Sequence, residues 1–223
     1  MQQRTDEWYK ARLGKITGSM VYVLMSTPRK KDEIFTDTAK SYLYQLAAER
    51  NLNDTYLTTK FDEWLSRTNV ETFAMRYGTE TEELARANYD MSLPDGMECR
   101  EVGFLSHPTI PNYGDSPDGM VYFHGEKEKT IEIKCPNPNT YMKYLDGFAH
   151  GKTLKEVEEK YYWQCVSHMV CGSVAMCDFI YYDKMQNNGM RVEPILLDAA
   201  DAEMLTERVQ LADNFVNEIL SRL

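Results

Sequence analysis

The sequence predicts an α/β domain in which helices flank a central mixed β-sheet. Three observations support this fold class. Helical periodicity dominates the first hundred residues, short segments rich in strand-forming residues follow from position 101, and apolar residues near the C-terminus recur every three or four positions. Each element therefore has one apolar face, and helices layered on a sheet bury such faces.

Four helices are predicted in the N-terminal part, over residues 6–13, 18–25, 36–50 and 71–89. Pro28 separates the second helix from the third, because proline does not continue a helix. The third helix has an apolar stripe formed by Tyr42, Leu43, Leu46 and Ala47. The fourth helix has the apolar residues Phe73, Tyr77, Leu84 and Ala87.

Five short strands are predicted after position 101, over residues 102–105, 119–123, 130–135, 176–182 and 191–197. Residues 124–129 predict a turn that joins the second and third strands into a hairpin. One helix is predicted between the third and fourth strands, over residues 154–170. The C-terminal helix has an apolar stripe with alternating steps of four and three, which favours burial in the same subunit: Leu205, Val209, Ala212, Val216, Ile219 and Leu223.

We expect the 223 residues to form one domain, since a chain of this length can bury a full-sized core. The domain is expected to comprise a helical part over about residues 1–95, a sheet core over about 96–198 and a C-terminal helix over about 200–223. No apolar run reaches the about 20 residues that a membrane-spanning helix needs. The N-terminal residues are too polar for a secretory signal peptide, so the expected compartment is the cytoplasm.

The cysteines do not have the spacing of a disulfide framework or a metal cluster. Their number is odd, and zinc and iron–sulfur ligands usually come in tight pairs, which are missing here. The last three recur every sixth residue, and we expect them to be buried as small apolar side chains. The five are Cys99, Cys135, Cys165, Cys171 and Cys177.

The formal net charge of −10 is unusual for a protein that binds nucleic acid over a broad surface. It does not exclude phosphate chemistry. Carboxylates gathered to bind Mg²⁺ make a site acidic until the ion inverts the local field.

One predicted strand carries an acid and a base two positions apart. In residues 130–135 (TIEIKC), Ile131 and Ile133 face one way, and Glu132 and Lys134 share the other face about 6.5–7 Å apart. On its own, such a spacing usually indicates an ion pair on a solvated strand face. The alternative is a catalytic site.

The stretch Ser116-Pro-Asp-Gly119 favours the catalytic alternative. It opens the preceding strand, so the hairpin brings Asp118 next to Glu132 and Lys134. Phosphodiester hydrolysis needs a nucleophilic water and a counter-charge, and a pair of divalent cations in one site supplies both. Asp118, Glu132 and the main-chain oxygen of Ile133 fit the shell of Mg²⁺, with Mn²⁺ as an alternative ion. Lys134 would orient the water or stabilise phosphate charge.

Together the two stretches form the PD-(D/E)-x-K nuclease pattern, and the chain resembles the phage lambda exonuclease (viral-type alkaline exonuclease) family of that superfamily. The resemblance implies a restriction-endonuclease-like core and covers about residues 8–170. The matching stretches are Trp8-Tyr-Lys-Ala-Arg-Leu-Gly14, Ile16-Thr-Gly-Ser19, Tyr77-Gly-Thr-Glu-Thr-Glu82, Ser116-Pro-Asp-Gly119, Ile131-Glu-Ile-Lys-Cys-Pro136 and Tyr162-Trp-Gln164.

The resemblance implies a role for each matching residue of the centre. Asp118 and Glu132 correspond to metal ligands and Lys134 to the catalytic lysine. Glu82 resembles the family's helical acid near the metals, and Gln164 the glutamine of a helix that packs across the site. The simpler alternatives are a solvated acid for Glu82 and an ordinary helix residue for Gln164.

Three further residues are implied to bind the DNA end. Arg12 and Ser19 resemble the group that binds the 5′-phosphate, and Met75 occupies the place of an apolar wedge that parts the end base pairs. The simpler alternative for Arg12 is an ion pair with Asp6 or Glu7 of its own helix. The simpler alternative for Met75 is burial in the core.

The chain departs from the family pattern at accessory positions. A further acid is expected where Pro108 stands, and a basic residue is expected at Thr140. His168 follows Gln164 by one helical turn, and we predict a structural role for it. Residues available to take over the accessory contacts are His107, Asp115, Thr140, Lys143 and His168.

The resemblance implies a Mg²⁺-dependent 5′→3′ exonuclease. It would degrade one strand of linear double-stranded DNA from a 5′-phosphorylated end to mononucleotides, leaving 3′ single strand for recombination. It also implies a ring-shaped homotrimer and a single-strand annealing recombinase as partner. Two alternatives stay open: a related PD-(D/E)-x-K endonuclease, which would cut closed circular DNA, and a non-catalytic DNA-end-binding protein.

Overall fold

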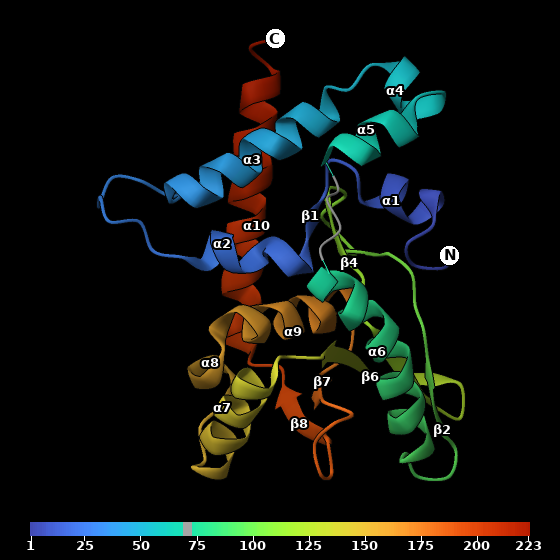
Figure 1. Cartoon of the computed structure of the whole chain (residues 1–223). Helices are drawn as coiled ribbons and strands as arrows, with labels where there is room; N and C mark the ends of the chain where they lie inside the picture. The colour runs from blue at the N-terminus through green and yellow to red at the C-terminus, as the bar shows by residue number, and fades with distance from the viewer. Residues whose placement is uncertain (69–72) are drawn as a thin grey trace.

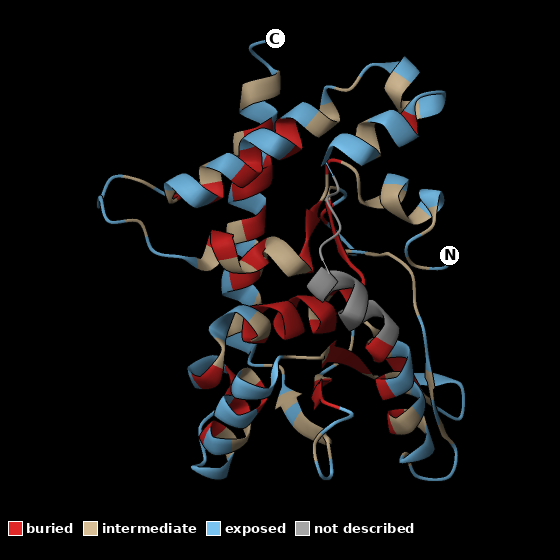
Figure 2. Cartoon of the chain, in the orientation of Figure 1, coloured by how far each residue is buried: buried red, intermediate tan, exposed pale blue. Residues whose placement is uncertain are grey.

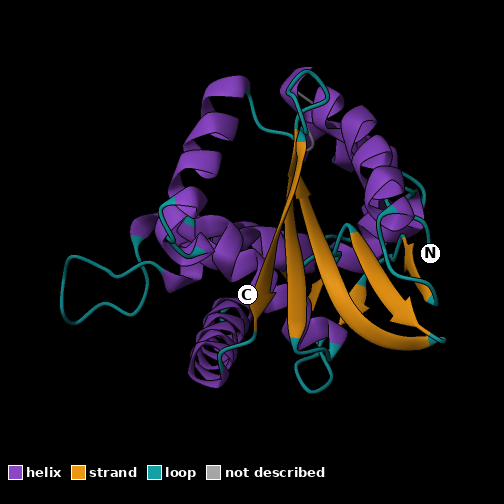
Figure 3. Cartoon of the chain, turned by 90° about the horizontal axis from the view of Figure 1, so that it is seen from below, coloured by secondary structure: helices purple, strands orange, loops and turns teal. Residues whose placement is uncertain are grey.

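The computed structural model describes residues 1–68 and 73–223, with the side chains of residues 73–80 outside that description. Five strands form a sheet in the order β2-β5-β6-β7-β8, with helices on both sides of it (Figures 1 and 3). β6 and β7 pair in parallel and the other neighbours are antiparallel. The predicted α/β class with a mixed sheet is confirmed. The strands are Met97–Arg100 (β2), Gly119–Phe123 (β5), Glu126–Lys134 (β6), Met176–Tyr182 (β7) and Met190–Leu196 (β8).

A second sheet of three short strands has the order β1-β4-β3. β1 runs parallel to β4, which brings the N-terminal segment beside the chain that leads into β5. The predicted strand over residues 102–105 is wrong except for its last residue. Phe104 packs instead on Gly114, where an added Cβ would lie 2.4 Å from the Phe104 ring. The strands are Ile16–Thr17 (β1), Leu105–Ser106 (β3) and Tyr113–Asp115 (β4).

The predicted N-terminal helices are present, with two additions, although the second begins as a 3₁₀ turn and residues 71–72 of the fourth lie outside the described residues. Thr36 caps α3 by accepting the N–H of Ala39 at 3.2 Å. The added helices α4 and α5 have five and eight residues, shorter than the window of about 11–18 residues in which helical periodicity is recognised. The elements are Asp6–Arg12 (α1), Gly18–Met20 (η1, a 3₁₀ turn), Val21–Met25 (α2), Asp37–Arg50 (α3), Asp54–Thr58 (α4), Phe61–Thr68 (α5) and Phe73–Met91 (α6).

Three helices lie between β6 and β7, where one was predicted. The predicted helix over residues 154–170 is interrupted at Glu158, whose backbone is not helical, with φ −156° and ψ 84°. Ahead of it, α7 was not predicted, although Asn137 caps it by accepting the N–H of Thr140 at 2.9 Å and Pro138 begins it. The helices are Pro138–Ala149 (α7), Leu154–Val157 (α8) and Glu159–Gly172 (α9).

The hairpin of β5 and β6 turns on two residues instead of the whole segment 124–129. His124 and Gly125 have φ angles of 49° and 89°, as a type I′ turn requires. Residues 126, 127 and 129 pair with β5 as part of β6, and Glu128 lies at a shift in the register. The prediction was wrong because the polar side chains of an exposed strand end resemble those of a loop.

The buried residues gather on α9 and on the helices and strands that face it (Figure 2). α10 (Ala199–Leu220) buries the predicted stripe at Leu205, Val209, Ala212 and Val216. Leu223 lies beyond the helix and is 83% exposed, so the prediction is wrong at that position. Cys165, Cys171 and Cys177 are buried, as predicted. Within the described ranges, no helix combines the length and the apolar character that a membrane span requires.

Candidate active site

Glu132 and Lys134 share one face of β6, and neither belongs to a solvated strand face. Glu132 is fully buried, and the Lys134 side chain is 25% exposed. The Lys134 ammonium contacts Oε1 of Glu132 as an ion pair. Ile131 and Ile133, which alternate with them, join an apolar cluster. The acid and the base are therefore held inside the protein.

Asp118 lies directly before β5 and is joined to β6 by two hydrogen bonds. Its main-chain N–H donates to the oxygen of Ile131 at 3.1 Å, and its Oδ2 accepts the N–H of Ile133 at 2.7 Å. Because these two residues flank Glu132, the structure brings Asp118 beside Glu132 and Lys134, as the hairpin predicts.

The charges of this group are strongly coupled. Burial raises the pKa of Asp118 well above its ordinary value, and the negative charges of Glu132 and Glu82 add to the rise. Burial also acts to raise the pKa of Glu132, but Lys134 and His168 outweigh it and lower that pKa to about 2. Burial opposes charge on Lys134, yet Glu132 and Asp118 raise its pKa. Glu132 and Lys134 are therefore both ionised at neutral pH.

Glu82 projects from α6 toward this group and is not a solvated acid. Its Oε2 accepts from Arg4 at 2.9 Å, and its Oε1 lies 3.4 Å from Nη1 of Arg86. The same Arg86 nitrogen donates to the main-chain oxygen of Asp118 at 2.9 Å. Arg4 and Arg86 were not predicted as site residues. Met75 lies outside the described side chains, so its predicted wedge role stays a prediction.

α9 crosses the same face of β6. Tyr161 places its ring 4.8 Å from Nζ of Lys134. One turn later Gln164 is buried, and a further turn later His168 reaches Glu132. Residues three and four apart share a helix face, so Gln164 lies on the same face of α9 as Tyr161 and His168.

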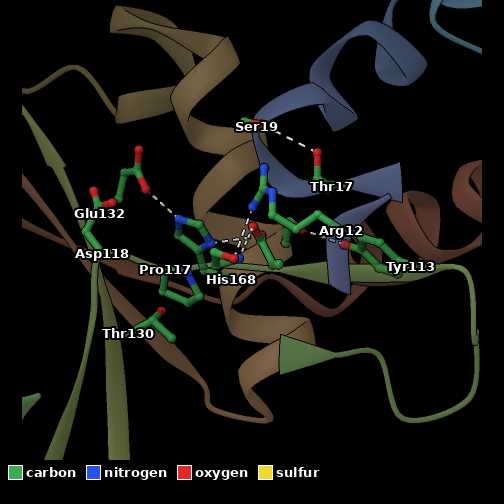
Figure 4. Close-up of polar contacts among 12 residues, drawn as sticks. Arg12, Thr17, Ser19, Tyr113, Pro117, Asp118, Thr130, Glu132 and His168 are labelled. Atoms are coloured by element: carbon green, nitrogen blue, oxygen red, sulfur yellow. Dashed lines mark hydrogen bonds and ion pairs between the residues drawn. The ribbon is translucent and has the colours of Figure 1, made fainter. Parts of the chain in front are cut away.

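His168 links two carboxylates inside the protein (Figure 4). Its Nε2 lies 2.5 Å from Oε2 of Glu132, and its Nδ1 lies 2.8 Å from Oδ2 of Asp115. Burial acts to lower the pKa of His168, but Asp115 and Glu132 raise it well above its ordinary value. Its contact with the site was not predicted, although its position one turn after Gln164 was a usable signal.

Arg12 bonds to the chain that leads into Asp118. Its Nη1 donates to Oγ of Ser116 at 3.0 Å, and Trp8 donates its indole N–H to the same oxygen at 2.9 Å. The guanidinium lies 4.2 Å from the centre of the Trp8 ring. The alternative pairing of Arg12 with Asp6 or Glu7 is therefore not adopted. Ser116 was missed as a site residue, although it belongs to the quoted motif.

A cavity beside Arg12 is lined by both polar and apolar side chains. Its polar lining includes Arg12, Lys15 and Ser19, whose hydroxyl lies 3.5 Å from that of Thr17. Its apolar lining includes Phe61, Trp64 and Leu65 of α5. Arg12 and Ser19 thus line one cavity, as expected of an anion-binding pair.

The accessory candidates divide into two groups. Nδ1 of His107 accepts the N–H groups of Thr109 and Ile110, so its bonds stay within a local turn. Thr140 contributes its N–H to the cap of α7, and Lys143 is exposed on the same helix. Asp115 and His168, by contrast, are joined directly to the site.

The residues present fit a divalent cation by their donor chemistry. Within the described part of the chain, Oε1 of Glu132 accepts no hydrogen bond besides its ion pair with Lys134. The repulsion that Asp118 receives from Glu132 and Glu82 is a cost that a cation would remove. No cluster of three His, Cys, Asp or Glu side chains with metal-binding geometry occurs in the described residues. Main-chain oxygen and waters would therefore complete the shell.

Comparisons with known proteins identify the family and the fold. The family model of the YqaJ-like viral recombinase domain matches residues 7–175. Crystal structures of the alkaline exonuclease LHK-Exo from Laribacter hongkongensis, alone and in complex with dAMP, are 30% identical in sequence, with a TM-score of 0.74 over 98% of this chain and 97% of theirs. A phage related exonuclease from Haemophilus somnus 129PT shares the fold at 16% identity, with a TM-score of 0.63 over 93% of this chain and 96% of its own. Among curated proteins, none matches significantly.

Proposed function

Because the chain belongs to the YqaJ-like viral recombinase family, we propose that it is a metal-dependent 5′→3′ exonuclease acting on the ends of double-stranded DNA. It would release mononucleotides from the 5′-phosphorylated strand and leave the 3′ strand for recombination. The observation that carries the proposal is the meeting of Asp118, Glu132 and Lys134 at one end of the β5–β6 hairpin.

Asp118, Glu132 and the main-chain oxygen of Ile133 would hold Mg²⁺, or Mn²⁺ in its place, with two ions in the site. A bound divalent cation supplies a nucleophilic water and a counter-charge for the phosphate. Lys134 stays protonated because of its two acidic neighbours, so its ammonium adds positive charge beside the reacting phosphate or orients the water.

Glu82 and Gln164 approach the same centre from the two helices that flank it. Glu82 is held by two arginines, which fix the orientation of its carboxylate. Gln164 offers a buried amide on the α9 face that contacts β6. We assign both to the positioning of water and phosphate at the centre.

Arg12, Ser19 and Ser116 would bind the terminal 5′-phosphate. The guanidinium can form bidentate hydrogen bonds to phosphate oxygens, and the two hydroxyls add donors. Arg12 bonds to Ser116, which lies two residues before Asp118 in the sequence. The anchor for the phosphate therefore contacts the segment that leads into the metal site. An enzyme that cuts inside a duplex has no use for such an anchor, and this favours the exonuclease over the endonuclease.

Digestion of a linear duplex tests the function. With Mg²⁺, a linear duplex carrying 5′-phosphates is expected to yield mononucleotides and one intact strand, because the anchor selects an end. Chelation of the metal is expected to stop the reaction. Products are sized on a denaturing gel, and closed circular DNA of the same sequence is the control. Cutting of the circle would favour the endonuclease, and binding without products would favour an end-binding protein.

Arg12→Ala is expected to remove the preference for 5′-phosphorylated over 5′-hydroxyl ends. Hydrogen bonds to a charged group contribute about 1.5–3 kcal/mol, so we expect the ratio of the two rates to fall about 10- to 100-fold. The ratio is measured with two duplexes that differ in the terminal group alone. Lys10→Ala, which removes an exposed cation from the same helix, is the control and should keep the preference. A preference retained in both variants would exclude Arg12 as the anchor.

The proposal extends to assembly and location. The resemblance implies a ring-shaped homotrimer and a single-strand annealing recombinase partner, and we propose action in the cytoplasm with them. The net charge of −10 is compatible with a ring, because basic residues are needed along its channel alone. A monomer in sedimentation equilibrium would contradict the trimer.

A further inference from the structure

Three ionisable side chains form a continuous buried chain that ends at Glu132, one of the candidate metal ligands. The side chains of Glu132 and His168 are fully buried, and that of Asp115 is 3% exposed. The imidazole contacts one carboxylate through each ring nitrogen, at 2.5 Å and 2.8 Å. Groups of this kind are costly to bury unless every one is paired. The core around α9 is otherwise largely apolar, so packing alone does not account for a histidine at this position.

The contact from His168 leaves the two oxygens of Glu132 in different environments. Oε2 is fixed by the imidazole, whereas Oε1 has the ion pair with Lys134 and accepts no other contact in the described residues. A carboxylate held through one oxygen presents the other in a defined direction. Partners of this kind behind a ligand typically change metal affinity or activity 10- to 100-fold when they are removed.

Asp115 is itself fixed through both oxygens, and therefore holds the imidazole firmly. Its Oδ1 accepts the N–H of Ser116 at 2.8 Å, and its Oδ2 faces His168. Gly18 makes room for this carboxylate, because an added Cβ there would lie 1.8 Å from Oδ2. Ser116 in turn accepts the hydrogen bond from Arg12. The buried chain thus starts at the candidate anchor of the DNA end and finishes at Glu132.

We propose that His168, oriented by Asp115, is a positioning residue that fixes Oε2 of Glu132 and so directs Oε1 toward the catalytic cation. This proposal rests on the proposed function, in which Glu132 is a metal ligand. The connection through Asp115 and Ser116 also sets the orientation of that ligand relative to the group that binds the 5′-phosphate.

Binding of Mn²⁺ alone, without DNA, tests the proposal through the electron paramagnetic resonance signal of the free ion. His168→Asn keeps a donor near the position of Nδ1 and loses the one to Glu132, whereas His168→Gln keeps a donor near the position of Nε2. We expect Mn²⁺ affinity to fall 10- to 100-fold in H168N and to stay within about threefold of wild type in H168Q. With DNA and saturating Mn²⁺, kcat in H168N should fall while KM for duplex ends stays within about twofold.

Ser167→Ala is the matched control. It removes a buried hydroxyl from the same helix, and that hydroxyl lies 2.7 Å from the hydroxyl of Tyr113. S167A should keep the wild-type affinity. Equal affinities in H168N and S167A, or an equal loss in H168Q and H168N, would overturn the proposal. If H168N does not fold, Asp115→Asn replaces it: a loss of more than twofold supports the proposal and an unchanged affinity refutes it. Wild-type protein that binds Mn²⁺ but degrades no DNA would refute the nuclease and leave this inference standing.

Discussion

Lys134→Ala is expected to slow DNA cleavage about a thousandfold while duplex ends still bind within a few-fold of wild type. The Lys134 ammonium contacts Oε1 of Glu132 and lies near the ring of Tyr161, and these contacts favour its charged form. A fixed cation in a partly dry site stabilises charge that develops in the transition state more than it stabilises bound substrate. Loss of Lys134 should therefore appear in the rate of the chemical step.

Single-turnover cleavage of a 5′-phosphorylated duplex at saturating enzyme measures this effect, with end binding measured separately in the presence of Ca²⁺. Lys129→Ala is the matched control. Lys129 lies on the same strand and pairs with Asp178 at 2.6 Å, so the control loses a comparable ion pair away from the site. K129A should cleave at nearly the wild-type rate. Equal single-turnover rates for K134A and wild type would remove Lys134 from the mechanism.

The parts of the site that are local in sequence could be predicted. The alternation in β6 places Glu132 and Lys134 on one face, and a hairpin brings Asp118 beside them with no information beyond strand period and turn. The fold class follows from the same kind of signal, because helical and strand periodicity are properties of short windows. The exact hairpin turn was misassigned because an exposed strand end and a loop have the same composition.

Other parts depend on contacts between distant segments, which no local pattern encodes. Asp115 and His168 are 53 positions apart, and Arg12 and Ser116 are 104 apart. The first pair meets because α9 packs across β4 and β6, and the second because β1 pairs with β4. A buried polar chain is visible only once the packing is known, so His168 was expected to be structural. Its two carboxylate partners are the basis of the positioning role that we propose for it.

Asp118→Asn is expected to reduce metal-dependent cleavage by at least about a thousandfold, because a cation's stabilisation of phosphate charge is worth several kcal/mol. The amide oxygen of asparagine can still accept the N–H of Ile133, so the hairpin should be preserved. The substitution therefore removes the negative charge of Asp118 and keeps its hydrogen bond. Without metal, that charge is unfavourable, since Asp118 is buried and also faces Glu132 and Glu82. D118N without metal should therefore melt at a higher temperature than wild type.

The pH dependence of this difference follows from the raised pKa of Asp118. Folded wild type holds the proton more tightly than the unfolded chain, so its stability falls as pH rises from the ordinary carboxyl pKa of about 3.9 to the raised pKa of the folded state. D118N lacks this slope, so its advantage in Tm should grow across that interval and then stay constant. Mg²⁺ should raise the Tm of wild type and leave that of D118N nearly unchanged. Asp178→Asn, which removes a buried carboxylate paired with Lys129, should lower Tm instead. A D118N protein less stable than metal-free wild type above that interval would show that Asp118 is not held near repelling acids, and the candidate metal centre would lose its electrostatic basis.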